Sequence, residues 1–164
     1  MAEEDRARRR VLVIGFGNPG RCDDGLGPVA AQAVETWGLD GVSVDADYQL
    51  TVEDSCAAAA HETVVFIDAA AEGPAPFSFR PVEGRVDLGF SSHGVEPEAV
   101  LGLAREVFGS RVEGYVLGIR GYDFDSFGER LSARAERNLA EALGFLQRRL
   151  ELGELDPKRG DQEV

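Results

Sequence analysis

The sequence has few cysteines and no long apolar run. Only Cys22 and Cys56 occur among 164 residues, so a framework of several disulfides is excluded, and the spacings of zinc fingers are absent. No stretch approaches the roughly 18 apolar residues of a membrane-spanning helix. The arginines at 6–10 precede an apolar segment at 11–14 that is too short for a signal-peptide core. We therefore expect a cytoplasmic protein with no membrane partner.

Positive charge is also scarce. Seventeen Lys and Arg residues stand against 30 Asp and Glu, which gives a formal net charge of −13. A protein this acidic repels the phosphate backbone, so we expect no nucleic-acid partner.

The chain length predicts one domain. We assign residues 1–10 to a charged N-terminal arm and 11–150 to the single domain. The segment 151–164 is mostly charged or polar and contains Pro157 and Gly160. Because such a segment buries little apolar surface, the sequence predicts a disordered tail there.

Strands and helices alternate within the domain. Apolar and β-branched runs predict strands at 11–16, 42–46, 63–67 and 112–119, and alternation predicts a strand nearer an edge at 77–82. Helical spacing of apolar residues predicts helices at 26–37, 98–108 and 132–150, and a further helix at 51–60 with Thr51 as N-cap. The pattern is typical of an α/β sandwich with a mostly parallel, twisted sheet and helices on both faces.

Three polar residues are expected on one rim of that sheet. Asp24 lies in the loop after the first strand, Asp68 directly follows the strand at 63–67, and His93 precedes a helix. Two carboxylates and one imidazole suit a borderline first-row metal and leave coordination positions open. The dipole of the following helix disfavours a charged His93, and the neutral ring is the form that binds metal.

Each residue also has a plainer interpretation. Asp24 is suited to cap the helix that starts near Gly25. Asp68 is a common residue type for a turn after a strand, and most loop histidines such as His93 have no functional role. Cys22, next to the acidic pair, is a possible extra soft ligand.

The glycine-rich segment leaves two further functions open. Gly15, Gly17 and Gly20 match the G-x-G-x-x-G fingerprint of dinucleotide-binding proteins, although the residues at 21–24 delay the helix that should hold the pyrophosphate. The segment 15–20 also looks like the opening of peptidyl-tRNA hydrolases, whose following Thr-Arg-His-Asn segment is missing here.

Taken together, the motifs resemble those of the nickel-iron hydrogenase maturation proteases. The resemblance is carried by Val11-Leu-Val-Ile-Gly-Phe-Gly-Asn18, Asp23-Asp-Gly-Leu-Gly-Pro28, Gln49-Leu-Thr-Val-Glu-Asp54, Val65-Phe-Ile-Asp-Ala69, Ser92-His-Gly94, Leu117-Gly-Ile119 and Leu131-Ser132. It extends over nearly all of residues 11–148.

The resemblance implies a three-layer α/β/α fold and an endopeptidase activity. The substrate would be the nickel-loaded precursor of a hydrogenase large subunit, which loses a short C-terminal extension. Asp24, Asp68 and His93 fall on the family's metal-binding and catalytic positions. Nickel would be supplied by the precursor, with other divalent metals able to substitute in the free protein. A non-hydrolytic scaffold for a nickel site is the remaining alternative.

Overall fold

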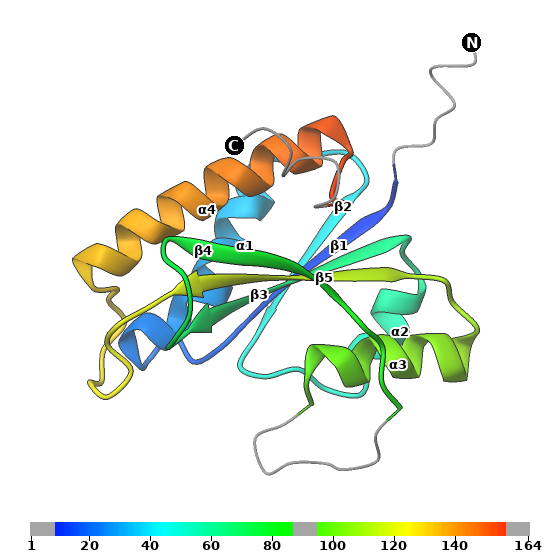
Figure 1. The fold of residues 1–164 in the computed structure, drawn as a ribbon, viewed down its shortest axis with the longest axis horizontal. Helices are drawn as coiled ribbons and strands as arrows, with labels where there is room; N and C mark the ends of the chain where they lie inside the picture. Colours follow the sequence, from blue (N-terminus) through cyan, green and yellow to red (C-terminus); the bar gives the residue numbers. More distant parts are fainter. Residues whose placement is uncertain (1–8, 87–94, 157–164) are drawn as a thin grey trace.

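The computed structural model describes residues 9–86 and 95–156. Within them, five strands form one sheet in the order β2-β1-β3-β5-β4, with β4 antiparallel to β5 and the other pairings parallel (Figure 1). The strands are β1 (Val11–Phe16), β2 (Val42–Asp47), β3 (Thr63–Ala70), β4 (Phe77–Val82) and β5 (Glu113–Arg120). The helices are α1 (Leu26–Thr36), α2 (Asp54–Ala59), α3 (Pro97–Phe108) and α4 (Ala133–Leu152).

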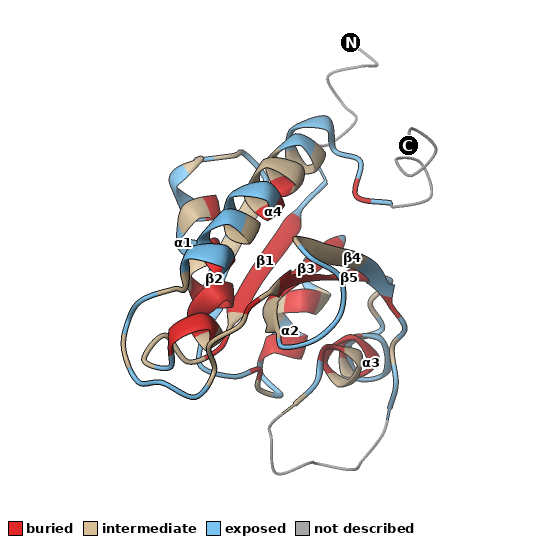
Figure 2. Ribbon diagram, turned by 60° about the vertical axis from the view of Figure 1, so that its left-hand side comes forward, coloured by how far each residue is buried: buried red, intermediate tan, exposed pale blue. Residues whose placement is uncertain are grey.

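Helices cover both faces of the sheet. In Figure 1, α1 and α4 lie on one side and α2 and α3 on the other. Because side chains of a strand alternate between faces, Val65 and Ile67 of β3 pack in the cluster with α1 and α4. Val64 and Phe66 pack in the cluster with α2 and α3. Figure 2 shows strand β1, which lies between β2 and β3, as largely buried. The predicted α/β/α sandwich is confirmed.

Two predicted boundaries near the candidate site are wrong. The helix expected from Thr51 begins at Asp54, because the Asp54 carboxylate accepts the Thr51 backbone N–H at 2.7 Å and holds the preceding residues in turns. Strand β3 continues through Asp68 to Ala70, since these residues keep their pairing with β5. Asp68 therefore lies within a strand rather than after it.

Ordered structure continues past residue 150, where the sequence predicts a disordered tail. Helix α4 continues to Leu152 and ends at Gly153, whose φ of 69° is favourable for glycine. Leu155 is only 7% exposed, so its apolar side chain holds the segment against the core. The prediction of a disordered tail is thus wrong for 151–156, while 157–164 and the arm at 1–8 lie outside the described residues. None of the described helices is long and apolar enough to cross a membrane.

Glycines bring α1 directly onto the carboxyl ends of β1 and β3. A side chain at Gly27 would collide with the carbonyl oxygens of Phe16 and Ile67, and one at Gly15 would collide with the Gly27 carbonyl. The first turn of α1 therefore contacts the strand backbones. This close approach places the segment before α1 beside the end of β3.

Candidate functional site

The Asp24 carboxylate organises the loop between β1 and α1. Asp24 lies in a short 3₁₀ helix, Cys22–Gly25. Its Oδ2 accepts the backbone N–H of Asn18 at 2.9 Å, and the Asn18 Oδ1 accepts the Gly20 N–H at 2.9 Å. At Gly17, φ is 143° and a side chain would meet the Asp24 carbonyl oxygen. The glycines thus allow the loop to wrap closely around Asp24.

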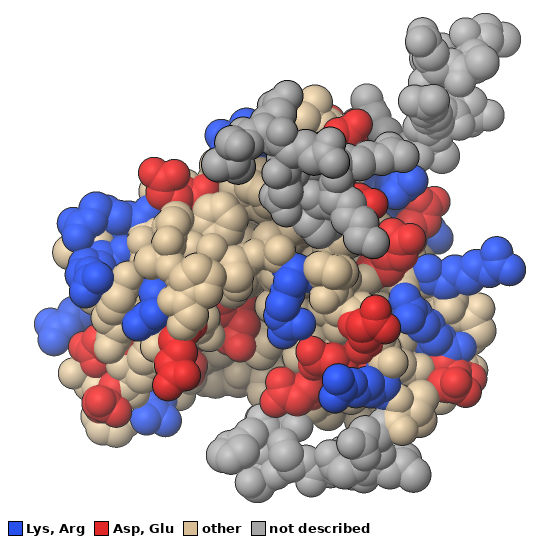
Figure 3. All heavy atoms as spheres, viewed as in Figure 1, with Lys and Arg blue, Asp and Glu red and all other residues tan. Residues whose placement is uncertain are grey.

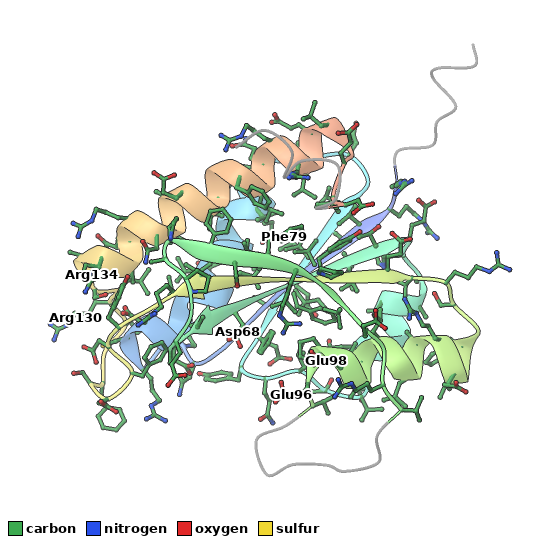
Figure 4. All side chains as sticks on the ribbon, viewed as in Figure 1. Asp68, Phe79, Glu96, Glu98, Arg130 and Arg134 are labelled. Carbon is green, nitrogen blue, oxygen red and sulfur yellow. The ribbon has the colours of Figure 1, made fainter. Side chains whose placement is uncertain are left out.

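Asp68 lies near the carboxyl end of β3. It has the same strand parity as Val64 and Phe66, so its side chain points to the α2 and α3 side of the sheet, as Figure 4 also shows. Its Oδ1 accepts the N–H of Ala69 at 2.8 Å. Asp24 and Asp68 therefore come from neighbouring strand ends, as the sequence predicts.

The pKa of Asp68 reflects its surroundings. Burial raises this pKa from its usual value to about 7, the Ala69 N–H acts in the opposite direction, and the negative charges of Asp24 and Glu96 raise it further. Because these negative charges repel one another and Asp68 is half-buried, binding of a cation or a proton at Asp68 is favourable. The electrostatics thus couple Asp24 to Asp68.

Glu96 is a third carboxylate whose charge acts on Asp68, and nothing in the sequence around it predicts this role. It is the exposed N-cap residue of α3, directly before Pro97, and Figure 4 shows it on the same side of the sheet as Asp68. The neighbouring Glu98 pairs with Arg80 at 3.6 Å, whereas Glu96 forms no ion pair with a described residue. In the sequence, Glu96 stands out only as the residue before Pro97 at the start of a helix, and such a pair is common at helix N-termini.

His93 lies outside the described residues. Within the ranges 9–86 and 95–156, no group of three or more His, Cys, Asp or Glu side chains is arranged to hold a metal ion. Of the three predicted ligands, the structure describes Asp24 and Asp68, and the charge of Asp24 acts on Asp68. Cys22, considered as an extra ligand, is 2% exposed and packs inside the fold.

The plainer interpretations of the two aspartates do not hold. The N-cap of α1 is Gly25 and receives no side-chain hydrogen bond, so Asp24 is not the cap of this helix. Asp68 is a strand residue and not a turn residue.

The structure also lacks the geometry that dinucleotide binding at the glycine-rich loop would need. Helix α1 begins at Leu26, six residues after Gly20, so its N-terminus does not meet the glycine loop. The Asn18 N–H, which lies in that loop, already donates to the Asp24 carboxylate.

Asp23 has a structural role that the sequence did not reveal. Its fully buried carboxylate accepts the backbone N–H groups of Tyr122, Asp123 and Ser132 and the Ser132 hydroxyl, at 2.7–2.9 Å. Burial alone would raise the pKa of Asp23, but these hydrogen bonds outweigh it and lower the pKa below 3.8. Asp23 thereby fastens the loop between β5 and α4 to the segment that carries Asp24.

Charges of both signs surround this region. Figure 3 shows several arginines at the left-hand end of the face, where Figure 4 labels Arg130 and Arg134, with acidic side chains both among them and nearer the centre.

The coupling between the two aspartates predicts a measurable shift. In Asp24→Asn the pKa of Asp68 should fall below about 7 and stay above the usual 3.8, because burial still acts on Asp68. Carboxyl-carbon NMR titration of the metal-free protein measures this pKa. The exposed Asp125 is not among the charges that raise it, so Asp125→Asn should leave it unchanged. Equal values in the wild type and Asp24→Asn would mean that the two carboxylates do not interact.

Comparisons with known proteins support the same fold. No family model and no curated protein matches the sequence significantly. Among solved structures, the maturation protease HycI from Thermococcus kodakarensis aligns with a TM-score of 0.69 and 21% identity over 92% of this chain and 99% of its own. A hydrogenase 2 maturation peptidase from a Thaumarchaeota archaeon aligns with a TM-score of 0.64 and 25% sequence identity, over 88% of this chain and 99% of its own.

A third similar structure is the hydrogenase maturating endopeptidase HybD from Escherichia coli. It aligns with a TM-score of 0.63 and 20% identity over 88% of this chain and 93% of its own. The similarity thus spans almost the whole of each chain. In architecture and in the order of its elements, the chain has the fold of the nickel-iron hydrogenase maturation proteases, the family that its motifs resemble.

Proposed function

We propose that the protein is an endopeptidase that removes a short C-terminal extension from the nickel-loaded precursor of a nickel-iron hydrogenase large subunit. The observation that carries this proposal is the placement of Asp24 and Asp68 at neighbouring strand ends, with the charge of Asp24 acting on Asp68. This pair lies in a fold shared with maturation endopeptidases. The cytoplasm, where precursors are made, is the proposed location.

His93 completes the proposed set of three. It precedes Glu96 by three residues, which is at most about 11 Å of extended chain, and the Glu96 charge acts on Asp68. An imidazole from this segment would add a nitrogen to the two carboxylates. Such a mixed set suits a borderline metal and leaves positions for ligands from the substrate.

The protein's own residues have two tasks in this mechanism. Asp24, Asp68 and His93 hold the substrate's nickel, so that only a precursor that has received its metal is fixed in the site. Nickel can polarise the scissile carbonyl or lower the pKa of bound water. Without a bound metal the pKa of Asp68 is about 7, so Asp68 could accept a proton at neutral pH only at a step in which it does not ligate the nickel.

The geometry of the Asn18 loop is fixed before substrate arrives. Asp24 is oriented by the Asn18 N–H, and the segment before it is fastened by Asp23. A site whose ligands are held by their surroundings loses less entropy when the substrate binds. Asn18 therefore acts as a loop-shaping residue.

The proposal is tested by incubating the protein with two forms of the precursor. We expect the nickel-loaded form to become shorter at its C-terminus, as measured by intact-mass spectrometry, and the nickel-free form to stay intact. Cleavage of both forms would contradict nickel recognition. Binding of the loaded precursor without any cleavage would instead support the scaffold alternative.

A further inference from the structure

A concave site lies at the edge of the sheet opposite Asp24 and Asp68. It is a cleft of about 950 Å³ beside the amino ends of β1, β3 and β5 and the C-terminal end of α4. Its volume is within the range of small-molecule sites. Because it lies at the opposite ends of the strands, it is separate from the candidate site.

The floor of the cleft includes apolar side chains and the hydroxyl group of Tyr115. Val11 and Leu155 line it and are almost fully buried. Tyr115 also lines it and is only 6% exposed, with its ring stacked on Phe79 at 5.2 Å. The Tyr115 hydroxyl forms no hydrogen bond with any described residue, yet it is not sealed from solvent. A buried hydroxyl that opens into a cleft without a partner is suited to bind a ligand.

The rim of the cleft is strongly acidic. Four exposed glutamates line it and form no ion pair with a described residue, namely Glu62, Glu113, Glu151 and Glu154. Among the described residues that line it, Arg9 is the one basic residue. Burial and the negative charges of Glu113 and Asp156 raise the pKa of Tyr115, so its hydroxyl stays neutral and its oxygen can accept a hydrogen bond from a cation.

The arrangement of these carboxylates favours an extended organic cation over a metal ion. Across the described part of the chain, no three acidic, cysteine or histidine side chains converge closely enough to hold a metal. The glutamates instead surround an apolar floor. An aliphatic polyamine matches both features, because its methylene groups cover the floor while its ammonium groups reach the rim.

We propose that this cleft binds an aliphatic polyamine, with the Tyr115 hydroxyl and the rim glutamates as hydrogen-bond acceptors for its ammonium groups. Spermidine is the probe, titrated into the full-length protein in a calorimeter at low salt. We expect one saturable site. Tyr115→Phe removes only the hydroxyl and should weaken binding about tenfold, as expected for a hydrogen bond to a charged group.

A pair of double variants separates a specific site from diffuse attraction to an acidic protein. Glu62→Gln with Glu113→Gln should weaken binding at least about tenfold. Glu106→Gln with Glu136→Gln changes the net charge equally at exposed helix positions away from the cleft and should have less than a twofold effect. Equal weakening in both pairs, no saturable binding, or an unchanged affinity in Tyr115→Phe would each overturn the proposal. Circular dichroism verifies that the variants are folded.

Discussion

Replacing Asp68 with asparagine is expected to reduce cleavage of the nickel-loaded precursor at least about 100-fold, which is the lower end of the usual contribution of a positioned acid–base group. Asparagine has nearly the same shape as aspartate and can still accept the Ala69 N–H that Asp68 accepts at 2.8 Å. It removes the negative charge with which we propose that Asp68 holds the substrate's metal. The rate is measured by following the mass of the precursor over time.

Asp24→Asn should have an effect of similar size, because the two carboxylates act on the same metal in this account. Asp125→Asn is the matched control, since Asp125 is exposed and lies in the loop between β5 and α4. It should cleave at the wild-type rate. A fully active Asp24→Asn or Asp68→Asn variant would remove the replaced aspartate from the mechanism.

The second large effect is on stability rather than on chemistry. Asp23→Ala should lower the free energy of unfolding by about 4 kcal/mol, because it leaves several buried donors without an acceptor, each costing about 1–3 kcal/mol. These donors are the N–H groups of Tyr122, Asp123 and Ser132 and the Ser132 hydroxyl. Urea unfolding measures the difference, and Asp125→Ala in the same loop should change it by less than about 0.5 kcal/mol.

The loss of unfolding free energy caused by Asp23→Ala should become smaller at low pH. The pKa of Asp23 in the folded protein is below its usual 3.8, so the stabilisation by its carboxylate is fully present above that value. It is lost as the pH falls through the folded-state pKa. The difference between wild type and Asp23→Ala should therefore narrow below about pH 4. A difference that is small at pH 7 would show that Asp23 does not fasten the loop.

Much of the fold was predictable because its signals are local. The apolar run of β1 and the helical spacing of α4 identify buried elements without knowledge of their neighbours. The start of α2 was predicted wrongly because Thr51 and Asp54 form a capping-box pattern that here closes a turn before the helix. The end of β3 was missed because its last residues are held by pairing with β5, which the sequence of β3 does not encode.

The sequence predicted the positions of Asp24 and Asp68 in the candidate site, but not the roles of Asp23 and Glu96. Asp24 follows β1 and Asp68 lies near the carboxyl end of the adjacent parallel strand β3, and the rule that ligands bind at the carboxyl ends of parallel strands places both on one rim of the sheet. The sequence could not show that Asp23 has a structural role while its neighbour Asp24 belongs to the candidate site. The reason is that the donors that bind Asp23 are about 100 residues away in sequence. Glu96 was missed because its relation to Asp68 depends on how α3 packs against the sheet.

The central claim is that Asp24, Asp68 and His93 bind one metal ion. A crystal structure of the protein grown with Ni²⁺, with data collected at the nickel absorption edge, locates the ion directly. We expect a single anomalous peak with an oxygen of Asp24, an oxygen of Asp68 and a nitrogen of His93 each within about 2.0–2.2 Å. An ion bound elsewhere, or Asp24 and Asp68 in separate coordination spheres, would contradict the account.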